Sequence, residues 1–447
     1  MSVMTSELQP HGLLSPGVFA PELYALEMDR VFGRCWLFVG HESMIPKPHD
    51  FFTHFMGESS IIVQRDAEGK IRIYLNKCRH RANIVCPFDR GTARSFTCSY
   101  HGWTYKDGSL TGIPHKKDAY RDEFDGTGWG LIEVPRVATI GGLIFGNWDK
   151  DAMSLDDYLG DAKWYLENFL CREDIGGLEV LPGPHRYVMP ANWKLLAENF
   201  AGDHYHFGIT HAGVAHALKQ EGDSRIALTA DAVKGKNYEF AVAAGYRKGP
   251  AHGLLQLQYG EGPYLLDLEH ARRLGPEAAE WIIERWRRLE ERLKDYKAKP
   301  YSFHVGNIFP NFSLIGVATG LYGKGLICHH PKGAAQTEIW MWCAVEKNAP
   351  QVVKDRQRFV LMQRQAAAGL VAPDDHENFE RISDIIYTRE SQMSPLHYAM
   401  AINHDEEDAR PPEIVGAEQW PGHIVSNYSE VMQRDFYRYW YSLMNAT

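Results

Sequence analysis

Residues 78–103 read CRHRANIVCPFDRGTARSFTCSYHGW, and they lie inside a run of short segments that alternate with turns. Between about Asp50 and Asp149, the segments FFTHFM, SSIIVQRD, IRIYLN, SFTCSY and GLIFGNW have the length and the β-branched or aromatic content of strands. The turn signals between them are Glu68-Gly69, Arg90-Gly91 and Asp107-Gly108. Many short strands at close spacing predict a small β domain or a barrel-like sandwich.

Two pairs of cysteine and histidine lie within this stretch. Cys78 is followed by His80 and, after 17 intervening residues, Cys98 is followed by His101. In a Rieske centre two thiolates hold one iron and two imidazoles hold the other. Each pair supplies one ligand to each iron, so two such loops close a [2Fe–2S] cluster from both sides. The spacing therefore predicts a Rieske cluster on these four side chains.

A structural zinc site is the alternative, because it is also made of two cysteines and two histidines. Zinc fingers usually pair cysteine with cysteine and histidine with histidine, at other spacings, so zinc is a distant second. Gly102 and Trp103 follow the second loop, and glycine permits the close backbone approach that tunes a cluster. Cys86 fits neither pair, and we expect it to be a small buried hydrophobe near the cluster.

The rest of the chain mixes helices and strands. A helix is predicted from Leu23 to Phe32, after the proline and carboxylate start at Pro21 and Glu22. Runs of helices and strands without regular βαβ alternation favour an α+β fold with an antiparallel sheet. The charged helix at 276–297 is expected to present a solvated face. The helical candidates are 155–170, 192–206, 276–297, 350–369 and 429–444, and the strand candidates are 184–190, 237–245, 302–308, 312–317, 325–331 and 337–346.

A second set of metal-ligand residues lies in 192–211, which reads NWKLLAENFAGDHYHFGITH. His206 and His211 are five apart, roughly 140° around an ideal helix, so the helix must end, bulge or bend between them if they share a metal. Gly208 lies in that gap and permits such a bend. Two histidines and one carboxylate form the facial triad of oxygen-activating iron enzymes. The carboxylate is either the local Asp203 or a remote one, for which the best candidate is the cluster DDHEN at 374–378.

Composition narrows the class of protein. The 447 residues are 44% hydrophobic, which allows two or three domains with real cores. A net charge of −9 argues against a nucleic-acid binder, which needs a basic face. No stretch has the apolar length of a membrane span and the N-terminus lacks signal-peptide regions, so we expect a cytoplasmic protein. Seven cysteines, an odd number, do not describe a disulfide framework.

These motifs together resemble the large (α) subunits of the Rieske non-haem iron aromatic-ring-hydroxylating dioxygenases, near the naphthalene and polycyclic-arene branch. The resemblance covers nearly the whole chain. It includes CWLFVGHESMIP (35–46), CRHRAN (78–83), CSYHGWTY (98–105), the 192–211 segment, FPNFSL (309–314), DDHEN and FYRYW (436–440). The implied fold is a Rieske β domain at 38–153 inserted into a catalytic domain formed by 1–37 and 154–447, with an antiparallel sheet covered by helices in a helix-grip arrangement.

The resemblance also implies roles for single residues. His206, His211 and Asp375 would bind the mononuclear iron. Asp203 would not be a ligand, but would bridge His206 to the Rieske histidine matching His101 in a neighbouring subunit, so the family is trimeric in α and often α3β3 with a small β subunit. Electrons from NADH would arrive through a reductase and a ferredoxin, since the chain shows no convincing strand–GxGxxG–helix or flavin fingerprint. The expected reaction is cis-dihydroxylation of an aromatic ring with O2.

The substrate pocket and two departures from the family follow from positions near the iron. For each pocket candidate, plain core packing is at least as good an interpretation; the candidates are Asn199, Phe200, Phe207, Gln365, Leu370 and Val371. Relatives commonly carry bulky aromatics where this chain has Gln365 and Val371, so we expect a roomier, more polar pocket that admits a polar or carboxylated arene. His204 replaces a small residue, and we expect it to point away from the iron.

The sequence leaves three alternative functions open. A Rieske monooxygenase that hydroxylates or demethylates an aromatic acid would use the same metals and differ in substrate scope. A Rieske electron carrier would not need the long remainder of the chain with its own histidine and carboxylate set. A zinc-stapled binding module would be colourless, whereas a Rieske protein is red-brown.

Overall fold

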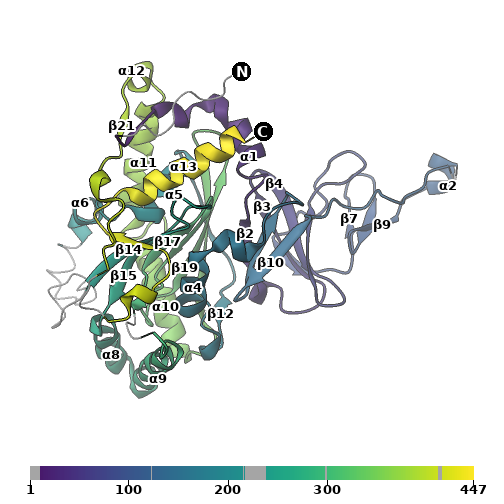
Figure 1. Cartoon of the computed structure of the whole chain (residues 1–447). Helices are drawn as coiled ribbons and strands as arrows, with labels where there is room; N and C mark the ends of the chain where they lie inside the picture. The colour runs from purple at the N-terminus through teal and green to yellow at the C-terminus, as the bar shows by residue number, and fades with distance from the viewer. Residues whose placement is uncertain are drawn as a thin grey trace. The chain divides into compact units, whose positions relative to one another are not determined.

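The computed structural model describes residues 11–121, 123–214, 216, 238–296, 300–410 and 415–446. The chain divides into two compact units (Figure 1). The inserted unit is Phe32–Leu155, and the main unit combines Met1–Val31 with Asp156–Thr447. Within the described ranges, none of the helices is both long and apolar enough to cross a membrane.

The inserted unit is built mostly of strands, as predicted, but they form three separate antiparallel sheets and not a closed barrel. It also carries one short helix, α2 (Lys116–Tyr120). The sheets are β10–β11–β2 (Arg136–Ile140, Leu143–Asn147, Leu37–His41), β5–β4–β3–β6 (Ile71–Leu75, Ser59–Arg65, Asp50–Met56, Arg90–Thr92) and β7–β8–β9 (Phe96–Thr97, Thr104–Lys106, Ser109–Gly112).

Two of the predicted turns in this unit are confirmed and one is wrong. Asp107 and Gly108 both have positive φ and join β8 to β9, as a two-residue hairpin loop requires. Gly69 also has positive φ, between β4 and β5. Arg90-Gly91, in contrast, lies inside β6 and pairs with β3. Packing favours glycine at position 91, because a Cβ there would lie 3.1 Å from the Phe51 ring.

The main unit contains a ten-stranded antiparallel sheet, which confirms the predicted α+β fold. Its path runs β12–β20–β19–β18–β17–β15–β14–β22, with β13 on β20 and β16 on β15. The sequence did not indicate β12, β15 or β22. The bounds, in the order of that path, are Leu178–Val180 (β12), Thr337–Glu346 (β20), Lys324–Pro331 (β19), Phe312–Ile315 (β18), Val305–Ile308 (β17), His252–Tyr259 (β15), Tyr238–Ala244 (β14) and His423–Ser426 (β22), and those of the two further strands are His185–Met189 (β13) and Pro300–Ser302 (β16). Residue 237 of the predicted strand 237–245 lies outside the described residues.

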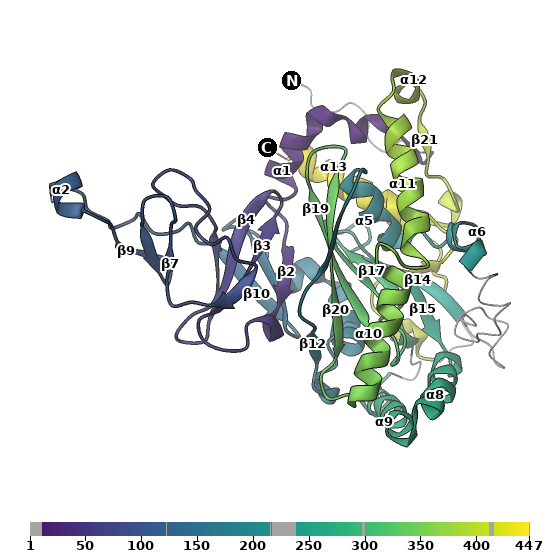
Figure 2. The ribbon, with the colours of Figure 1, turned by 180° about the vertical axis from the view of Figure 1, so that it is seen from behind.

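Helices pack on this sheet and position the site. α5 (Trp193–Gly202) lies on β15, β17, β18 and β19, and α13 (Val431–Asn445) lies on α5. Figure 1 shows α13 in front of the sheet, and Figure 2, from behind, shows α10 (Gln351–Gln365) and α11 (Ala372–Ile386) one after the other. The remaining α-helices among the described residues are α1 (Tyr24–Arg30), α3 (Leu155–Leu159), α4 (Asp161–Tyr165), α6 (Phe207–Thr210), α8 (Gly262–Leu274), α9 (Pro276–Arg292) and α12 (Arg389–Gln392).

A buried polar cluster holds the start of α5. The Asn192 side chain caps the helix by accepting from Lys194 N at 3.0 Å. The Lys194 ammonium is buried and pairs with Glu27 of α1, which also accepts from the indoles of Trp193 at 3.0 Å and Trp440 at 2.9 Å. Removing one partner of such a buried pair would leave an uncompensated charge. The cluster therefore ties α1, α5 and α13 together.

The charged helix predicted at 276–297 is α9, with residue 297 outside the described part of the chain. Its outer face is charged as predicted, while Ala278, Ile282 and Leu289 are buried on the inner face. Arg285 on that inner face is also buried and pairs with Glu346 of β20 at 2.7 Å. Burial acts to raise the pKa of Glu346, but the neighbouring cations outweigh it and lower the pKa to about 2.

Candidate metal centres

The two Cys/His loops of the inserted unit have the same backbone design. In the first loop, Ala82 N donates to Cys78 O at 3.0 Å, and in the second, Gly102 N donates to Cys98 O at 2.9 Å. Both closing residues are left-handed, with φ of 61° for Ala82 and 72° for Gly102. A Cβ on Gly102 would lie 2.6 Å from Pro114 Cγ, so glycine is needed there, as the sequence indicated. Ala82 adopts the same conformation although it carries a Cβ.

The loops bring the four predicted ligands into two pairs. The His80 and His101 rings lie 4.5 Å apart between centroids, and Trp103 stacks on His80 at 5.1 Å. Cys78 and Cys98 are both buried. Burial acts to raise the pKa of the Cys98 thiol, but hydrogen bonds from the Tyr100 and His101 backbone, Asn83 and Cys78 outweigh it and lower that pKa. The arrangement favours a thiolate at Cys98.

These residues suit a [2Fe–2S] cluster. Nδ1 of His80 is buried and has no hydrogen-bond partner among the described groups. Two buried sulfurs and a neighbouring pair of imidazoles provide the mixed donor set of a Rieske centre. Cys86 is buried in the same apolar cluster, and burial raises the pKa of its thiol, as expected for a packing residue.

Sequence patterns missed two groups that surround the sulfurs. The Tyr105 hydroxyl lies 3.4 Å from Cys78 Sγ and accepts from Arg79 N at 3.0 Å. The Asn83 amide donates to Cys98 Sγ at 3.6 Å. Both residues lie within the quoted motifs, but only the folded loops show that their polar atoms turn inward to the sulfurs.

The second metal centre lies where α5 ends. The predicted helix 192–206 is too long, because α5 stops at Gly202 and Asp203 leaves the helical region with φ −88° and ψ 82°. The break therefore precedes His206, and the predicted hinge at Gly208 is wrong. Gly208 lies inside α6 and has no positive φ. After this early break, His206 and His211 flank α6, and their rings lie 5.3 Å apart between centroids.

His206, His211 and Asp375 converge in the main unit. Their donor atoms all lie within 4.8 Å of one another. Asp375 Oδ1 is 3.3 Å from Nε2 of each histidine. Burial opposes both pKa shifts, yet hydrogen bonds with Asp203 and Asp375 raise the pKa of His206 to about 10, and hydrogen bonds with His206 and His211 lower the pKa of Asp375 to about 2. Two imidazole nitrogens and one carboxylate around a common point are the donor set of a non-haem Fe(II) site.

Each of these two histidines meets a second carboxylate at its other nitrogen. Asp203 Oδ2 lies 3.2 Å from His206 Nδ1, and Asp374 Oδ2 lies 3.3 Å from His211 Nδ1. Asn199 Nδ2 is 3.5 Å from His206 Nδ1. A carboxylate at Nδ1 fixes the ring and directs Nε2 to a metal. Asp374 belongs to the predicted acidic cluster, in which the resemblance implied Asp375 as the iron ligand and gave Asp374 no role.

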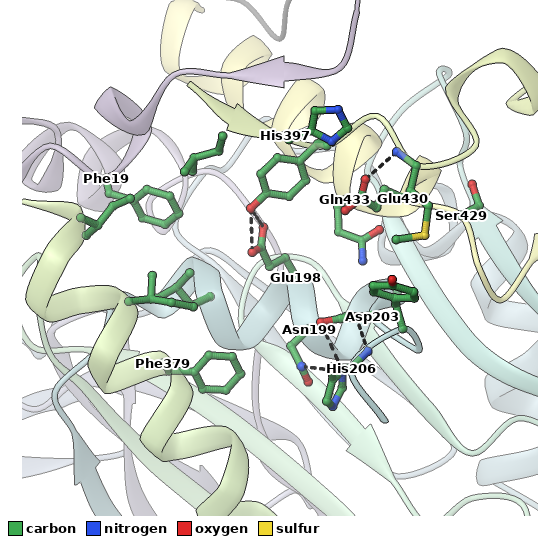
Figure 3. A pocket seen from close by; sticks show the side chains of 18 of the residues that line it. Phe19, Glu198, Asn199, Asp203, His206, Phe379, His397, Ser429, Glu430 and Gln433 are labelled. Atoms are coloured by element: carbon green, nitrogen blue, oxygen red, sulfur yellow. Dashed lines mark hydrogen bonds and ion pairs between the residues drawn. The ribbon is translucent and has the colours of Figure 1, made fainter. Parts of the chain in front are cut away.

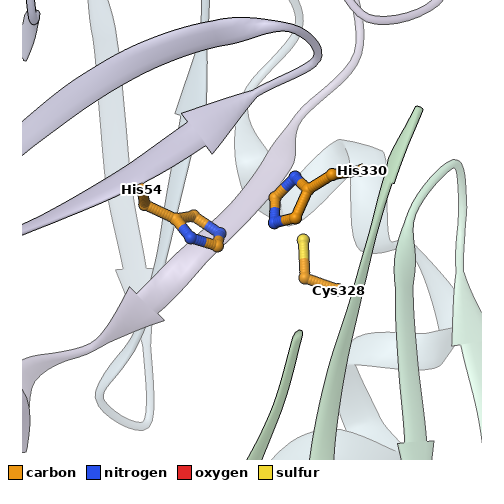
Figure 4. Close-up of side chains that lie close together, drawn as sticks. All are labelled: His54, Cys328 and His330. Carbon is orange, nitrogen blue, oxygen red and sulfur yellow. The ribbon is translucent and has the colours of Figure 1, made fainter. Parts of the chain in front are cut away.

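The six predicted pocket residues occupy different surroundings. The Gln365 amide donates to the Tyr322 hydroxyl at 3.4 Å, and Val371 is the N-cap of α11. Phe207 and Leu370 are exposed, at 40% and 42%. The Phe200 ring lies 6.0 Å from His329 of β19. Cys328 and His330, on either side of His329, point to the other side of that strand (Figure 4).

A cavity of about 410 Å³ opens beside the α5 terminus (Figure 3). Of the six pocket candidates, Asn199 is the one that lines it, together with Asp203 and His206. His204, between these two, turns elsewhere. Its Nδ1 lies 2.9 Å from Gln256 Nε2, and its ring stacks on Phe207.

Family models match most of the chain. The model described as "Ring hydroxylating alpha subunit (catalytic domain)" matches residues 155–446, and the model "Rieske [2Fe-2S] domain" matches residues 35–134. Among curated proteins, the chain is 35% identical to the biphenyl 2,3-dioxygenase subunit alpha of Rhodococcus jostii (strain RHA1), covering 97% of this chain and 89% of that protein. It is 34% identical to a benzene 1,2-dioxygenase subunit alpha of Pseudomonas putida, covering 97% and 92%.

A solved structure shows the same similarity to ring-hydroxylating dioxygenases. A crystal structure of a naphthalene 1,2-dioxygenase variant bound to phenanthrene superposes with a TM-score of 0.82 at 31% identity, covering 100% of this chain and 96% of that one. The chain belongs to the ring-hydroxylating dioxygenase α subunits. It is an oxidoreductase with a Rieske [2Fe–2S] cluster and a mononuclear non-haem iron, and it is the terminal oxygenase component that dihydroxylates an aromatic ring.

Proposed function

We propose that His206, His211 and Asp375 hold the mononuclear iron, that Cys78, His80, Cys98 and His101 hold the Rieske cluster, and that the substrate is a neutral arene. The observation that carries the iron assignment is the convergence of two Nε2 atoms on one Asp375 oxygen at 3.3 Å. Relatives named for biphenyl, benzene and naphthalene support the substrate class. When bound, the iron supplies oxygen activation at its open positions.

The chain's own residues position and protect this chemistry. Asp374 fixes the His211 ring, and Asp203 fixes that of His206. We assign Asp203 the further role of bridging His206 to the Rieske histidine of a neighbouring subunit, because its exposed fraction of 36% leaves one side of the carboxylate open. A bridge between subunits requires an oligomer, which we propose to be α3 or α3β3. We also propose that residues 38–153 form the Rieske domain and that residues 1–37 and 154–447 form the catalytic domain.

Reducing equivalents must come from other proteins. We propose NADH as the source, with a reductase and a ferredoxin as carriers, because the sequence has no convincing dinucleotide or flavin fingerprint. A cytoplasmic location is supported by the cysteines, since none of the seven forms a disulfide.

A second candidate substrate is a polar or carboxylated arene. The observation that favours it is the polar group at the end of α10. Gln365 bonds to the buried Tyr322 hydroxyl, and the Arg364 guanidinium lies 5.2 Å from the Tyr322 ring centroid.

One experiment separates the two candidates. The purified oxygenase is supplied with NADH, a class-matched reductase and ferredoxin, and a panel of neutral arenes and aromatic carboxylates under ¹⁸O-labelled O2. A diol with both labelled atoms from a neutral arene supports the first candidate. Turnover of aromatic carboxylates alone rejects the neutral arene in favour of the second candidate. Loss of turnover in His206→Ala with an unchanged Rieske spectrum checks the iron assignment.

A further inference from the structure

Glu198 occupies an unusual place in the cavity beside the iron site. It lies in α5, one turn before Asp203, and its carboxylate faces the cavity (Figure 3). The Tyr398 hydroxyl donates to Oε1 at 3.0 Å and to Oε2 at 3.1 Å. The cation nearest to it along α5 is Lys194, which is already paired with Glu27. Among the described residues, no cation forms an ion pair with the Glu198 carboxyl group.

The cavity wall is rich in hydrogen-bond acceptors. Oε1 of Gln433 and Oδ1 of Asn427 are buried and have no partner among the described groups, and both residues line the cavity. Only 5% of each of these two residues is exposed. Asp203 and Glu430 add two more carboxyl groups to the same wall. A space of about 410 Å³ with these acceptors on part of its wall is large enough for several ordered water molecules.

Like charges and burial both favour a proton in this cavity. Three carboxyl groups facing one space repel one another when all are ionised. Burial raises the pKa of Glu198 to about 8, although the tyrosine hydroxyl contacts lower it, and burial also raises the pKa of Glu430. The groups that face Glu198 are Tyr398, Tyr437 of α13, Asp203 and Glu430, with Lys194 along its own helix. At neutral pH Glu198 is therefore poised to gain or lose a proton.

The reaction of this enzyme class needs protons. Cis-dihydroxylation of an arene consumes one O2, two electrons from the reductase chain and two protons. The O–O bond breaks, one ring double bond is replaced by two C–O bonds, and each oxygen gains one proton. The two electrons reduce the O2 and arene together to the diol. The protons come from solvent, and the cavity that Glu198 and His206 both line lies beside the site that uses them.

We propose that Glu198, held by Tyr398, is a proton store for this reaction: it takes a proton from the hydrated cavity and releases it into the same cavity beside His206. Tyr398 is the positioning residue, because its hydroxyl touches both carboxylate oxygens and aims them at the cavity. The inference concerns the dioxygenase reaction whichever arene is the substrate.

The first test is a titration that requires no turnover. Infrared spectra of the holoenzyme are recorded between pH 6 and 10, and the spectrum of Glu198→Gln is subtracted. Ordinary carboxyl groups are ionised over this range. A protonated-carboxyl band present at pH 6 and lost through about pH 8 is expected in wild type and absent in Glu198→Gln. No such band in the wild-type enzyme overturns the proposal.

The second test uses the hydrogen bond from Tyr398. Its donation favours the ionised carboxylate, so Tyr398→Phe should move the titration of Glu198 to higher pH, and the upper limb of the pH–rate profile should move with it. Glu198→Gln should remove that limb, with the Rieske spectrum and iron content unchanged. Glu380→Gln, an exposed change on α11, is the matched control. A rate profile that is the same in all variants overturns the proposal even if the infrared band titrates.

Discussion

Asp374 provides a direct test of how this site holds its metal. Its Oδ2 lies 3.3 Å from His211 Nδ1, while the Nε2 of the same ring faces Asp375. Asp374→Ala removes the group that fixes the ring, so His211 loses its preferred orientation towards the metal. Loss of such a carboxylate costs 10–100-fold in metal affinity in proteins of this kind, about 1.4–2.7 kcal/mol. Because the Asp374 side chain is 40% exposed, we expect the lower end, about tenfold.

The assay is competition for Fe(II) between the protein and a chelator of known affinity. The Rieske spectrum reports the integrity of the inserted unit in the same sample. Asp374→Asn keeps an acceptor oxygen near Nδ1 and should lose less affinity than Asp374→Ala. Asp384→Ala makes the same change at an exposed position of α11 and is the control. Equal Fe(II) affinity in Asp374→Ala and Asp384→Ala would refute the argument that Asp374 orients His211.

Three further predictions follow from single contacts. Asp203→Asn should keep both metals bound and reduce turnover by more than about tenfold, measured as product per reduced cluster, because it removes the charged acceptor at His206 Nδ1; ordinary turnover would contradict the bridge. Ala82→Gly should stabilise the inserted unit by about 1 kcal/mol in thermal unfolding, since alanine is strained at φ 61°; a lower unfolding temperature would contradict this. Burial lowers the pKa of His252 to about 4, so this residue contributes stability at pH 7 that is lost as pH falls from about 6.5 to 4, roughly 3 kcal/mol in all. His252→Gln should flatten that part of the stability curve, and an unchanged slope would count against it.

Local sequence patterns predicted much of the fold for a simple reason. Strand length, helical spacing and turn chemistry are short-range properties, so the β character of 50–149, α10 and the hairpin at Asp107-Gly108 could be inferred directly. The same rules failed at Arg90-Gly91, where glycine serves packing against Phe51. They also missed β15, which lies inside the large sheet and lacks a clear polar alternation, and β22, a four-residue strand at the edge of that sheet.

The end of α5 shows the limit of such rules most clearly. The helical pattern continues past Gly202, and the hinge was expected at Gly208. The helix instead ends at Gly202, and the side chain of the next residue, Asp203, accepts from His206 N at 3.3 Å where the chain turns. A side chain that bonds to its own downstream backbone competes with the helix, and spacing alone does not show which wins.

The sequence by itself determined the chemistry of this protein: four Cys and His residues at cluster spacing, two histidines, and an acidic cluster far along the chain. Ligand type and local spacing depend only on residues close together in the sequence, so they can be inferred without a structure. The tertiary structure decided what depends on distance between remote segments. It placed Asp375 at both Nε2 atoms and Asp374 at His211 Nδ1, although the two aspartates are neighbours in sequence and more than 160 residues from the histidines. It also placed Tyr398 on Glu198, 200 residues apart, because only the packing of the folded main unit brings such groups into one cavity.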